Sequence, residues 1–155
     1  MADALGDVKL EWTSTSMDAA IEDDDIAIDP GLRTAVLLSL MLDRRAEDDD
    51  VLPSDDGDRR GWWADELAAV EGDLVGSRLW LLDRSKRRED IVRRADEMVR
   101  EALAWMLEDR VAASLDVEIE LGARELLIGV TVHRPTGDPV TFRFAHVWAG
   151  EADRL

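Results

Sequence analysis

The alternation of apolar and polar residues in the last third of the chain predicts three β-strands. In SLDVEIEL (114–121) an apolar side chain occupies every second position, and RELLIGVTVHR (124–134) and VTFRFAHVW (140–148) repeat this pattern. A period of two residues places those side chains on one face of a strand. Because Gly122 and the segment RPTGDP supply turns between the runs, we expect an antiparallel β-meander with one apolar face.

A period of three to four residues between Lys86 and Leu107 predicts a long helix before this meander. Its apolar face carries Ile91, Ala95, Met98, Ala102 and Trp105. Arginine and glutamate side chains supply a charged outer face. At ~1.5 Å per residue the expected length is roughly 30 Å, and the apolar stripe can cover the apolar side of the meander.

The N-terminal half of the chain predicts shorter elements. In VKLEW (8–12) apolar residues alternate with charged ones as in a half-buried strand, and a polar connection leads to the extended segment DIAID (25–29). Residues 29–45 form a predicted helix that is apolar around much of its circumference. We expect Asp29 to be its N-cap and Pro30 to take the first helical position.

Residues 46–60 (AEDDDVLPSDDGDRR) predict a solvated acidic loop, with a proline and a glycine as breakers. Two short helical pieces follow at 62–70 and 77–82. Together the elements predict an α+β fold in a single domain spanning residues 1–155. In this fold the long helix and the additional N-terminal helices pack on one face of the meander.

Charge and composition exclude several classes of function. The chain has 36 acidic and 19 basic residues, which gives a net charge of −17. Such a surface repels nucleic acid and anionic membranes, because binding to them depends on lysine and arginine. No cysteine is present for disulfides or a thiolate zinc site, and no apolar run approaches the ~20 residues that cross a bilayer. The N-terminal MADALGDVKLEW lacks the pattern of a secretory signal, which favours synthesis in the cytosol.

Three acidic clusters, at residues 23–25, 48–50 and 55–58, are candidates for a calcium site. A calcium loop needs oxygen ligands at alternating positions and a late bidentate glutamate. None of the clusters has that spacing. We therefore expect no metal and no cofactor.

Enzymatic groups are sparse in this sequence. A glycosidase needs two carboxyl groups that face each other across the substrate. Glu108 and Asp109 are the only pair worth considering, and consecutive residues of a helix diverge by ~100°, so a polar helix end is the simpler interpretation. His133 and His146 lie in no spacing that suggests a catalytic triad.

The chain has six tryptophans and no tyrosine, and the tryptophans could stack on sugars or bases, fill a core or anchor a protein partner. Three of them lie on predicted apolar faces and are expected in the core: Trp12, Trp105 and Trp148. Trp62 and Trp63 are neighbours whose side chains point about 100° apart on a helix, so one core face seldom takes both. One of the two is therefore a candidate anchor for a protein partner.

Four blocks occur in order along the chain: DIAID-PGLRTAVLLSLMLDRRA, GWWADELA, GSRLWLL and REALAWMLED, followed by the paired strands. This order, from about Asp25 to Trp148, closely resembles the tail baseplate protein family of Mu-like contractile-tailed phages (the gene-product-forty-six family). More distantly, the pattern is similar to the small wedge protein of T-even phage baseplates and its type VI secretion counterpart.

The resemblance implies a structural protein of the virion's tail baseplate, assembled in the host cytoplasm with six copies around the tail axis. Its implied partners are other wedge proteins and the tail sheath subunit. The wider family carries a Glu-Pro-Arg motif where the long helix meets the first strand, and Glu108-Asp109-Arg110 occupies that place here. Glu108 and Arg110 are therefore implied to fasten the protein to the helical core bundle of the wedge.

A meander covered on one side leaves sheet edges to which another chain can add a strand. We expect this edge to be the strand 140–148, which carries Phe142, Phe144 and Trp148, because only a short tail follows it. The leading hypothesis is a wedge component without enzymatic activity that initiates the sheath by strand addition. The alternatives are a lysozyme-like cell-wall glycosidase at the tail tip, acting through Glu108 and a partner carboxylate, and an acidic adaptor with no phage role.

Overall fold

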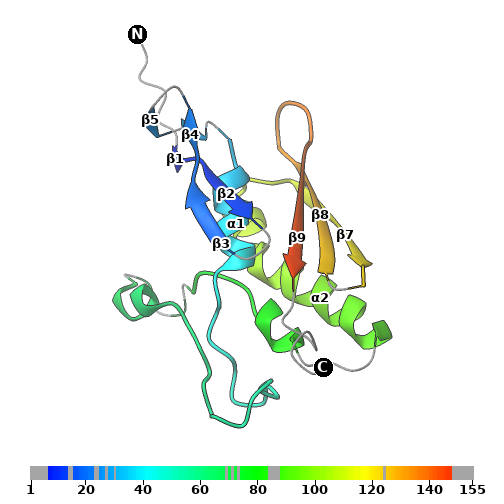
Figure 1. The fold of residues 1–155 in the computed structure, drawn as a ribbon. Coiled ribbons are helices and arrows are strands. Elements are labelled where there is room, and N and C mark those ends of the chain that lie inside the picture. Colours follow the sequence, from blue (N-terminus) through cyan, green and yellow to red (C-terminus); the bar gives the residue numbers. More distant parts are fainter. Residues whose placement is uncertain are drawn as a thin grey trace.

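The three alternating segments form the predicted antiparallel sheet, and the fold class is α+β. The strands are paired in the order β7-β8-β9: β7 (Ser114–Leu121), β8 (Glu125–His133) and β9 (Val140–Val147) (Figure 1). Val130 of β8 lies between Val117 of β7 and Phe142 of β9. The register thus aligns the apolar residues of all three strands on one face.

The computed structural model describes most of the chain. The described residues are 7–13, 16–22, 25–26, 28–29, 31–68, 70, 72, 74–83, 88–123 and 125–147. Pro30 and Trp148 lie outside these residues, and so does the side chain of Trp12. The expectations for the Pro30 position and for burial of Trp12 and Trp148 therefore stay predictions.

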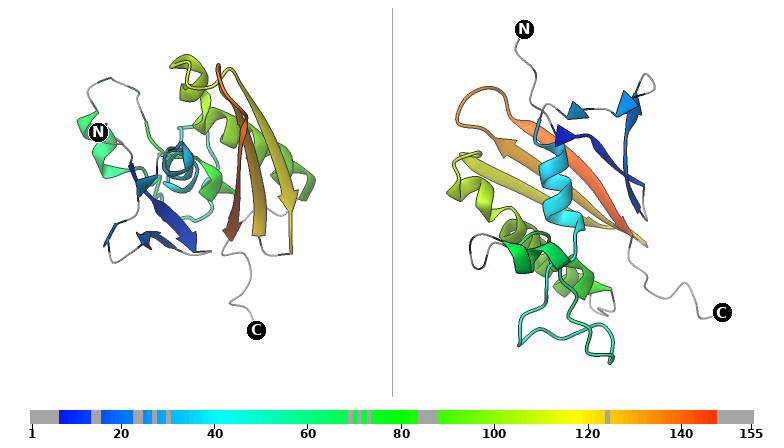
Figure 2. Two further views of the ribbon diagram at one scale, coloured as in Figure 1. Left: turned by 90° about the horizontal axis from the view of Figure 1, so that it is seen from above. Right: turned by 90° about the vertical axis from the view of Figure 1, so that its left-hand side faces the viewer.

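Helices cover one face of the sheet and leave the other face bare (Figure 2). α1 (Arg33–Met41) and α2 (Arg88–Ala102) lie on the covered side, where α2 packs along β7. Fully buried side chains come from helices and sheet alike, and they include Leu37, Leu40, Val99, Ile128 and Val130. None of the described helices is long and apolar enough to cross a bilayer.

The long helix predicted over 86–107 is interrupted near its end, so that prediction is wrong in part. α2 ends before Leu103, whose ψ of 4° is not helical, and a short helix α3 (Ala104–Glu108) follows. The interruption accompanies a tertiary contact, because Trp105 Nε1 donates a hydrogen bond to Ser39 Oγ on α1 at 3.0 Å. A periodic sequence shows the apolar face of a helix but not such a contact with another element.

The prediction that Asp29 is the N-cap of α1 is also wrong. The helix begins at Arg33, with Leu32 as N-cap and no side-chain capping bond, and Asp29 belongs to a short strand. Near the start of the helix, Thr34 Oγ1 donates to the carbonyl of Val8 at 2.9 Å. The position of α1 is therefore set by contact with the N-terminal strands.

The described residues before α1 form three small antiparallel ladders, where the sequence predicted a strand, a polar connection and one further extended segment. The pairs are β1 (Asp7–Val8) with β6 (Ile28–Asp29), β2 (Leu10–Thr13) with β3 (Ser16–Ala19), and β4 (Ile21–Glu22) with β5 (Asp25–Ile26). Leu10 and Met17, from β2 and β3, pack against the edge of the core. The sequence SMDA of β3 has too little apolar periodicity to predict a strand.

The two predicted helical pieces between the acidic loop and α2 are shorter 3-10 helices: η1 (Trp63–Leu67) and η2 (Leu79–Leu82). All four residues of η2 are buried. Gly76 precedes η2 with a φ of +100°, and a Cβ there would overlap the carbonyl oxygen of Leu42. This close approach lets Ser77 exchange 2.9 Å backbone hydrogen bonds with Leu42 and Arg44, which joins η2 to the end of α1.

Candidate partner-binding surfaces

The acidic loop at residues 46–60 is held against the core by Arg78. The guanidinium donates to Asp50 of the loop at 2.7 Å and to Glu101 of α2 at 2.8 Å, and Arg44 lies 3.7 Å from the same glutamate. Burial alone would lower the pKa of Arg78, but its hydrogen bonds to Glu101 and Asp50 outweigh that effect and raise the pKa. The loop is therefore anchored to the core, which its acidic composition did not indicate.

Two further arginines fix the C-terminal end of this loop. Arg59 donates to the carbonyl of Glu47, and Arg60 donates to Asp43 at 2.7 Å. The Arg60 guanidinium also lies over the indole of the buried Trp80, 4.6 Å from the ring centroid, in a cation–π contact. These contacts hold the last two residues of the loop against Asp43, Glu47 and Trp80.

Replacing Arg78 with methionine is expected to destabilise the protein and to loosen the loop. The change leaves Asp50 without this partner and Glu101 with only its longer contact to Arg44 in a partly buried site, so we expect a loss of about 1–3 kcal/mol in the free energy of unfolding. Chemical denaturation measures this loss, and hydrogen exchange should speed up across residues 46–60. The control Arg93→Met removes an exposed pair with Glu97 on α2 and should change stability by less than about 0.5 kcal/mol. Equal losses in the two variants would contradict the anchoring role of Arg78.

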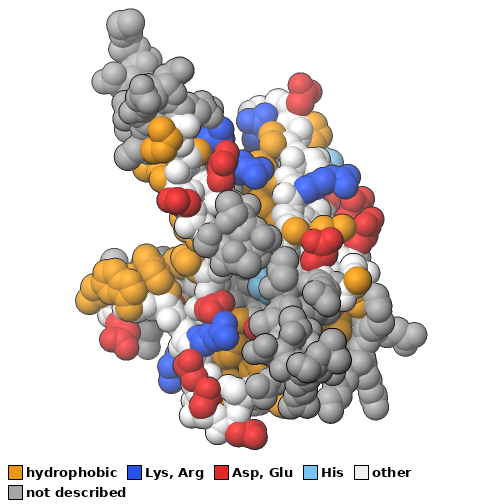
Figure 3. Space-filling view, viewed as in Figure 1, with side chains coloured by type: hydrophobic (Ala, Val, Ile, Leu, Met, Phe, Trp, Pro, Cys, Tyr) orange, Lys and Arg blue, Asp and Glu red, His pale blue; other side chains and the backbone are white. Residues whose placement is uncertain are grey.

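Trp62 and Trp63 lie on a projection beside this loop. Trp62 is 37% exposed and Trp63 is 73% exposed, and their ring centroids are 6.0 Å apart with the planes tilted by 55°. Leu67, at the end of η1, is exposed as well. Figure 3 shows hydrophobic side chains gathered on this projection, at the left of the view. The sequence predicted one exposed tryptophan here, and the structure exposes both.

The base of the projection is closed by a hydrogen bond within it. Asp65 Oδ1 accepts the backbone N–H of Val75 at 3.2 Å, which joins η1 to the residues before Gly76. A surface that is already ordered loses less conformational freedom when a partner binds. The exposed tryptophans are thus presented on an organised segment.

The segment Glu108-Asp109-Arg110 forms an exposed corner between α3 and β7. Arg110 adopts the left-handed conformation, with a φ of 60°, and Asp109 N–H donates to the carbonyl of Trp105 at 2.8 Å. A proline at this central position would have no N–H to donate, so Asp109 permits a backbone hydrogen bond that proline would remove. Within the described residues, the Glu108 and Arg110 side chains form no ion pair. Both charges are available to a partner.

β9 is an edge of the sheet in the part of the chain that the structure describes. Phe142 and Phe144 are 7% and 5% exposed on its covered face, so their side chains belong to the core. A partner at this edge would therefore meet mainly the backbone of β9. β7 is the other edge, but the charged side chains along it disfavour pairing with another strand.

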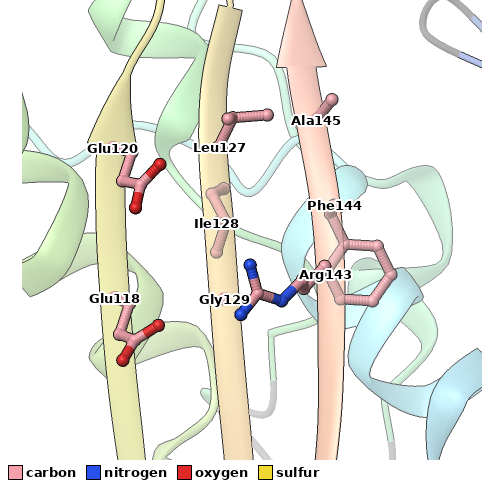
Figure 4. A pocket seen from close by; sticks show the side chains of 8 residues that line it. All are labelled: Glu118, Glu120, Leu127, Ile128, Gly129, Arg143, Phe144 and Ala145. Atoms are coloured by element: carbon pink, nitrogen blue, oxygen red, sulfur yellow. The ribbon is translucent and has the colours of Figure 1, made fainter.

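The bare face of the sheet is hollowed at its centre (Figure 4). The hollow has a volume of ≈250 Å³, and its walls include Glu118, Glu120, Leu127, Gly129, Arg143 and Ala145. Glu118 and Arg143 flank Gly129 in one row across the three strands. The sequence did not predict this feature, because it depends on the register between strands.

The geometry gives the glycosidase alternative no support. Glu108 is exposed, whereas an acid catalyst of this kind sits in an apolar pocket that keeps it protonated. His133 lies 2.6 Å from Asp116 on the bare face of the sheet, and His146 lies 3.9 Å from Asp83 on the covered face. The described residues contain no group of three or more histidine or carboxylate side chains placed to hold a metal ion.

An exposed aromatic projection, an unpaired charged corner and an open strand edge are typical of a structural protein that binds other proteins. Comparison with known proteins agrees with this class. The family model described as "Phage protein GP46" matches residues 32–139, which include the Trp62-Trp63 projection and the Glu108–Arg110 corner. "Baseplate protein gp46" of Escherichia phage Mu is 35% identical over 147 residues, covering 94% of this chain and 99% of the relative. "Mu-like prophage FluMu protein gp46" of Haemophilus influenzae is 29% identical over 146 residues, with the same coverage.

Together, the relatives and the surfaces define a structural protein of the phage tail baseplate. The chain belongs to the phage protein GP46 family. The family was correctly identified from the ordered sequence blocks. The names of the relatives support a structural role in the baseplate, which makes the exposed surfaces described above candidates for contact with other baseplate components.

Proposed function

We propose that this baseplate protein joins the core bundle of the wedge and initiates sheath assembly by β-strand addition at β9. The observation that carries the proposal is the outer edge of β9, which no described strand pairs. A strand added there gains main-chain hydrogen bonds, and its alternate side chains provide selectivity. The buried Phe142 and Phe144 support this mode, because they hold β9 firmly on the core while its edge stays open.

Two exposed features are the proposed contacts with the wedge. The corner offers the opposite charges of Glu108 and Arg110, and the projection offers the aromatic surfaces of Trp62 and Trp63. Tryptophan and arginine are the residue types most enriched among interface hot spots. The net charge of −17 favours partner surfaces that are basic around these points.

The proposed partners are other wedge proteins and the sheath subunit, with six copies of the chain around the tail axis. The high negative charge makes copies of this chain repel one another. A ring of copies is therefore expected to be held by the wedge and sheath rather than by direct contacts between copies.

Replacing Glu108 with glutamine separates this role from the glycosidase alternative. The change keeps the size of the side chain and removes its charge, and losing one partner of a buried charge pair weakens an interface by about 2–5 kcal/mol. We therefore expect incorporation into tails to fall by roughly 30-fold or more, with no lytic activity in either protein. Electron microscopy of tails and a cell-wall lysis assay measure the two properties.

Glu97→Gln, on the exposed side of α2, is the matched control and should assemble normally. Lysis by the unchanged protein that disappears in Glu108→Gln, together with normal tails, would favour the enzyme over the scaffold.

A further inference from the structure

Gly129 lies in the middle of the central strand β8, and its contacts with the described residues do not require a glycine there. Its φ is not positive, and a Cβ added to it would meet Cβ and Oε2 of Glu118 at 3.5 Å, an ordinary van der Waals contact. At Gly76, by contrast, an added Cβ would overlap the Leu42 carbonyl. Glycine weakens the interior of a strand, and one that the fold does not need indicates close approach by another molecule.

Gly129 lines the hollow on the bare face of the sheet (Figure 4). In the next row of the sheet, Leu127 is 38% exposed and Ala145 is small, so the floor of the hollow is apolar. Its volume of ≈250 Å³ is below the range of about 300–1,000 Å³ that is usual for cofactor-sized ligands. A single large side chain fits this space better than a small-molecule ligand does.

Charged side chains surround this apolar floor. Figure 4 shows Glu118 and Arg143 in the row of Gly129, with Glu120 one row away on the same strand as Glu118. None of these three side chains makes a hydrogen bond or ion pair with another described residue. Two carboxylates against one guanidinium leave the hollow net negative, which complements a cation.

We propose that this hollow receives a lysine or arginine side chain from a neighbouring protein of the assembled tail. The aliphatic stem of that side chain lies on Gly129, Leu127 and Ala145, and its charged head donates to Glu118 and Glu120. Arg143 then donates to a backbone carbonyl of the same segment. A second copy of this chain is disfavoured as the occupant, because two chains of net charge −17 repel each other.

Replacing Gly129 with valine tests the proposal with two effects of opposite sign. Valine suits the interior of a strand, so the Tm of the isolated protein is expected to rise by about 2–4 °C. The same side chain fills the hollow, so incorporation into tails is expected to fall by at least about tenfold. Ser114→Val adds bulk at the end of β7 on the same bare face, outside the hollow, and should leave incorporation unchanged. A lower Tm or normal incorporation of Gly129→Val would overturn the proposal.

The charge requirement is tested by replacing both Glu118 and Glu120 with glutamine. Incorporation is expected to fall at least about tenfold, because the head of the incoming side chain loses both acceptors. The double variant Asp49→Asn with Asp55→Asn changes net charge equally on the acidic loop and should assemble normally. An equal loss in both double variants would mean that overall charge, and not this hollow, governs assembly.

A photo-reactive phenylalanine in place of Leu127, cross-linked in assembled tails, identifies the occupant by mass spectrometry. The expected product joins position 127 to a segment of another tail protein that contains lysine or arginine at or next to the linked residue. A cross-link to another copy of this chain, to a segment without a basic residue, or to no protein at all overturns the proposal. The hollow lies on the face and not on the edge of the sheet, so this result stands whether or not β9 adds a strand.

Discussion

Replacing Arg110 with glycine is expected to leave the fold intact and to abolish incorporation of the protein into tails. Arg110 holds a φ of 60°, a conformation that costs a non-glycine residue roughly 1–2 kcal/mol. Glycine removes this strain, which stabilises the folded state. It also has more conformational freedom in the unfolded chain, which destabilises the folded state by about 0.5–1 kcal/mol and cancels much of that gain. The free energy of unfolding should therefore stay within about 1 kcal/mol of its original value, as measured by urea denaturation.

The expected loss of assembly has a different cause from any loss of stability. The guanidinium at the corner makes no ion pair with the described residues. Its removal is therefore expected to break only the contact with the proposed partner. An arginine that pairs with a carboxylate across an interface contributes several kilocalories, and we expect incorporation to fall by roughly 100-fold or more. Electron microscopy and quantitation of purified tails measure this fall.

Two controls accompany Arg110→Gly. Arg93→Ala removes the same charge from the exposed side of α2 and should assemble normally. Arg110→Asn should behave as the glycine variant does, because asparagine tolerates the left-handed conformation and also lacks the charge. Normal tails with Arg110→Gly would show that the corner is a structural turn and not a contact.

The second large effect is expected at the aromatic projection. Replacing Trp63 with alanine should weaken association with purified wedge proteins by about 2 kcal/mol or more, roughly a 30-fold change in Kd. Trp62→Ala should have a smaller effect, because Trp62 already has much of its surface covered by the chain itself. Both variants should keep the Tm of the parent protein, since neither side chain belongs to the buried core.

Val51→Ala provides the control for the tryptophan variants. Val51 is a highly exposed apolar residue on the acidic loop and not part of η1, and its truncation should leave binding unchanged. Titration of labelled protein with the wedge proteins measures all three affinities. Unchanged binding by both tryptophan variants would remove the projection from the proposed interface.

The three strands of the meander, which depend on local periodicity, were predicted correctly from the sequence. Apolar and polar residues alternate along each of the strands β7, β8 and β9. A shift of one residue in the pairing would turn every apolar side chain to the other face of the sheet, so this alternation fixes the register. The interruption at Leu103 and the start of α1 were missed for a common reason. Each involves contact between elements distant in the sequence, such as Trp105 with Ser39 and Thr34 with Val8, which no local pattern encodes.

The candidate surfaces divide in the same way. The sequence Glu108-Asp109-Arg110, which resembles a known motif, indicated where the corner lies between α3 and β7. The exposure of Trp62 and Trp63 was predicted in part, because two adjacent tryptophans seldom fit one core face. The anchoring of the acidic loop by Arg78 was missed, because charge counts do not show which arginine meets which carboxylate. The hollow over Gly129 was missed as well, since it exists only once three strands are placed in register.

The central claim is that this chain works by offering its surfaces and the open edge of β9 to neighbouring subunits. Imaging a whole tail end at side-chain resolution tests it most directly. We predict that β9 is hydrogen-bonded to a strand of the sheath subunit and that Glu108 and Arg110 contact helices of the wedge core. A tail in which the outer edge of β9 and the Glu108–Arg110 corner both face solvent would contradict the account.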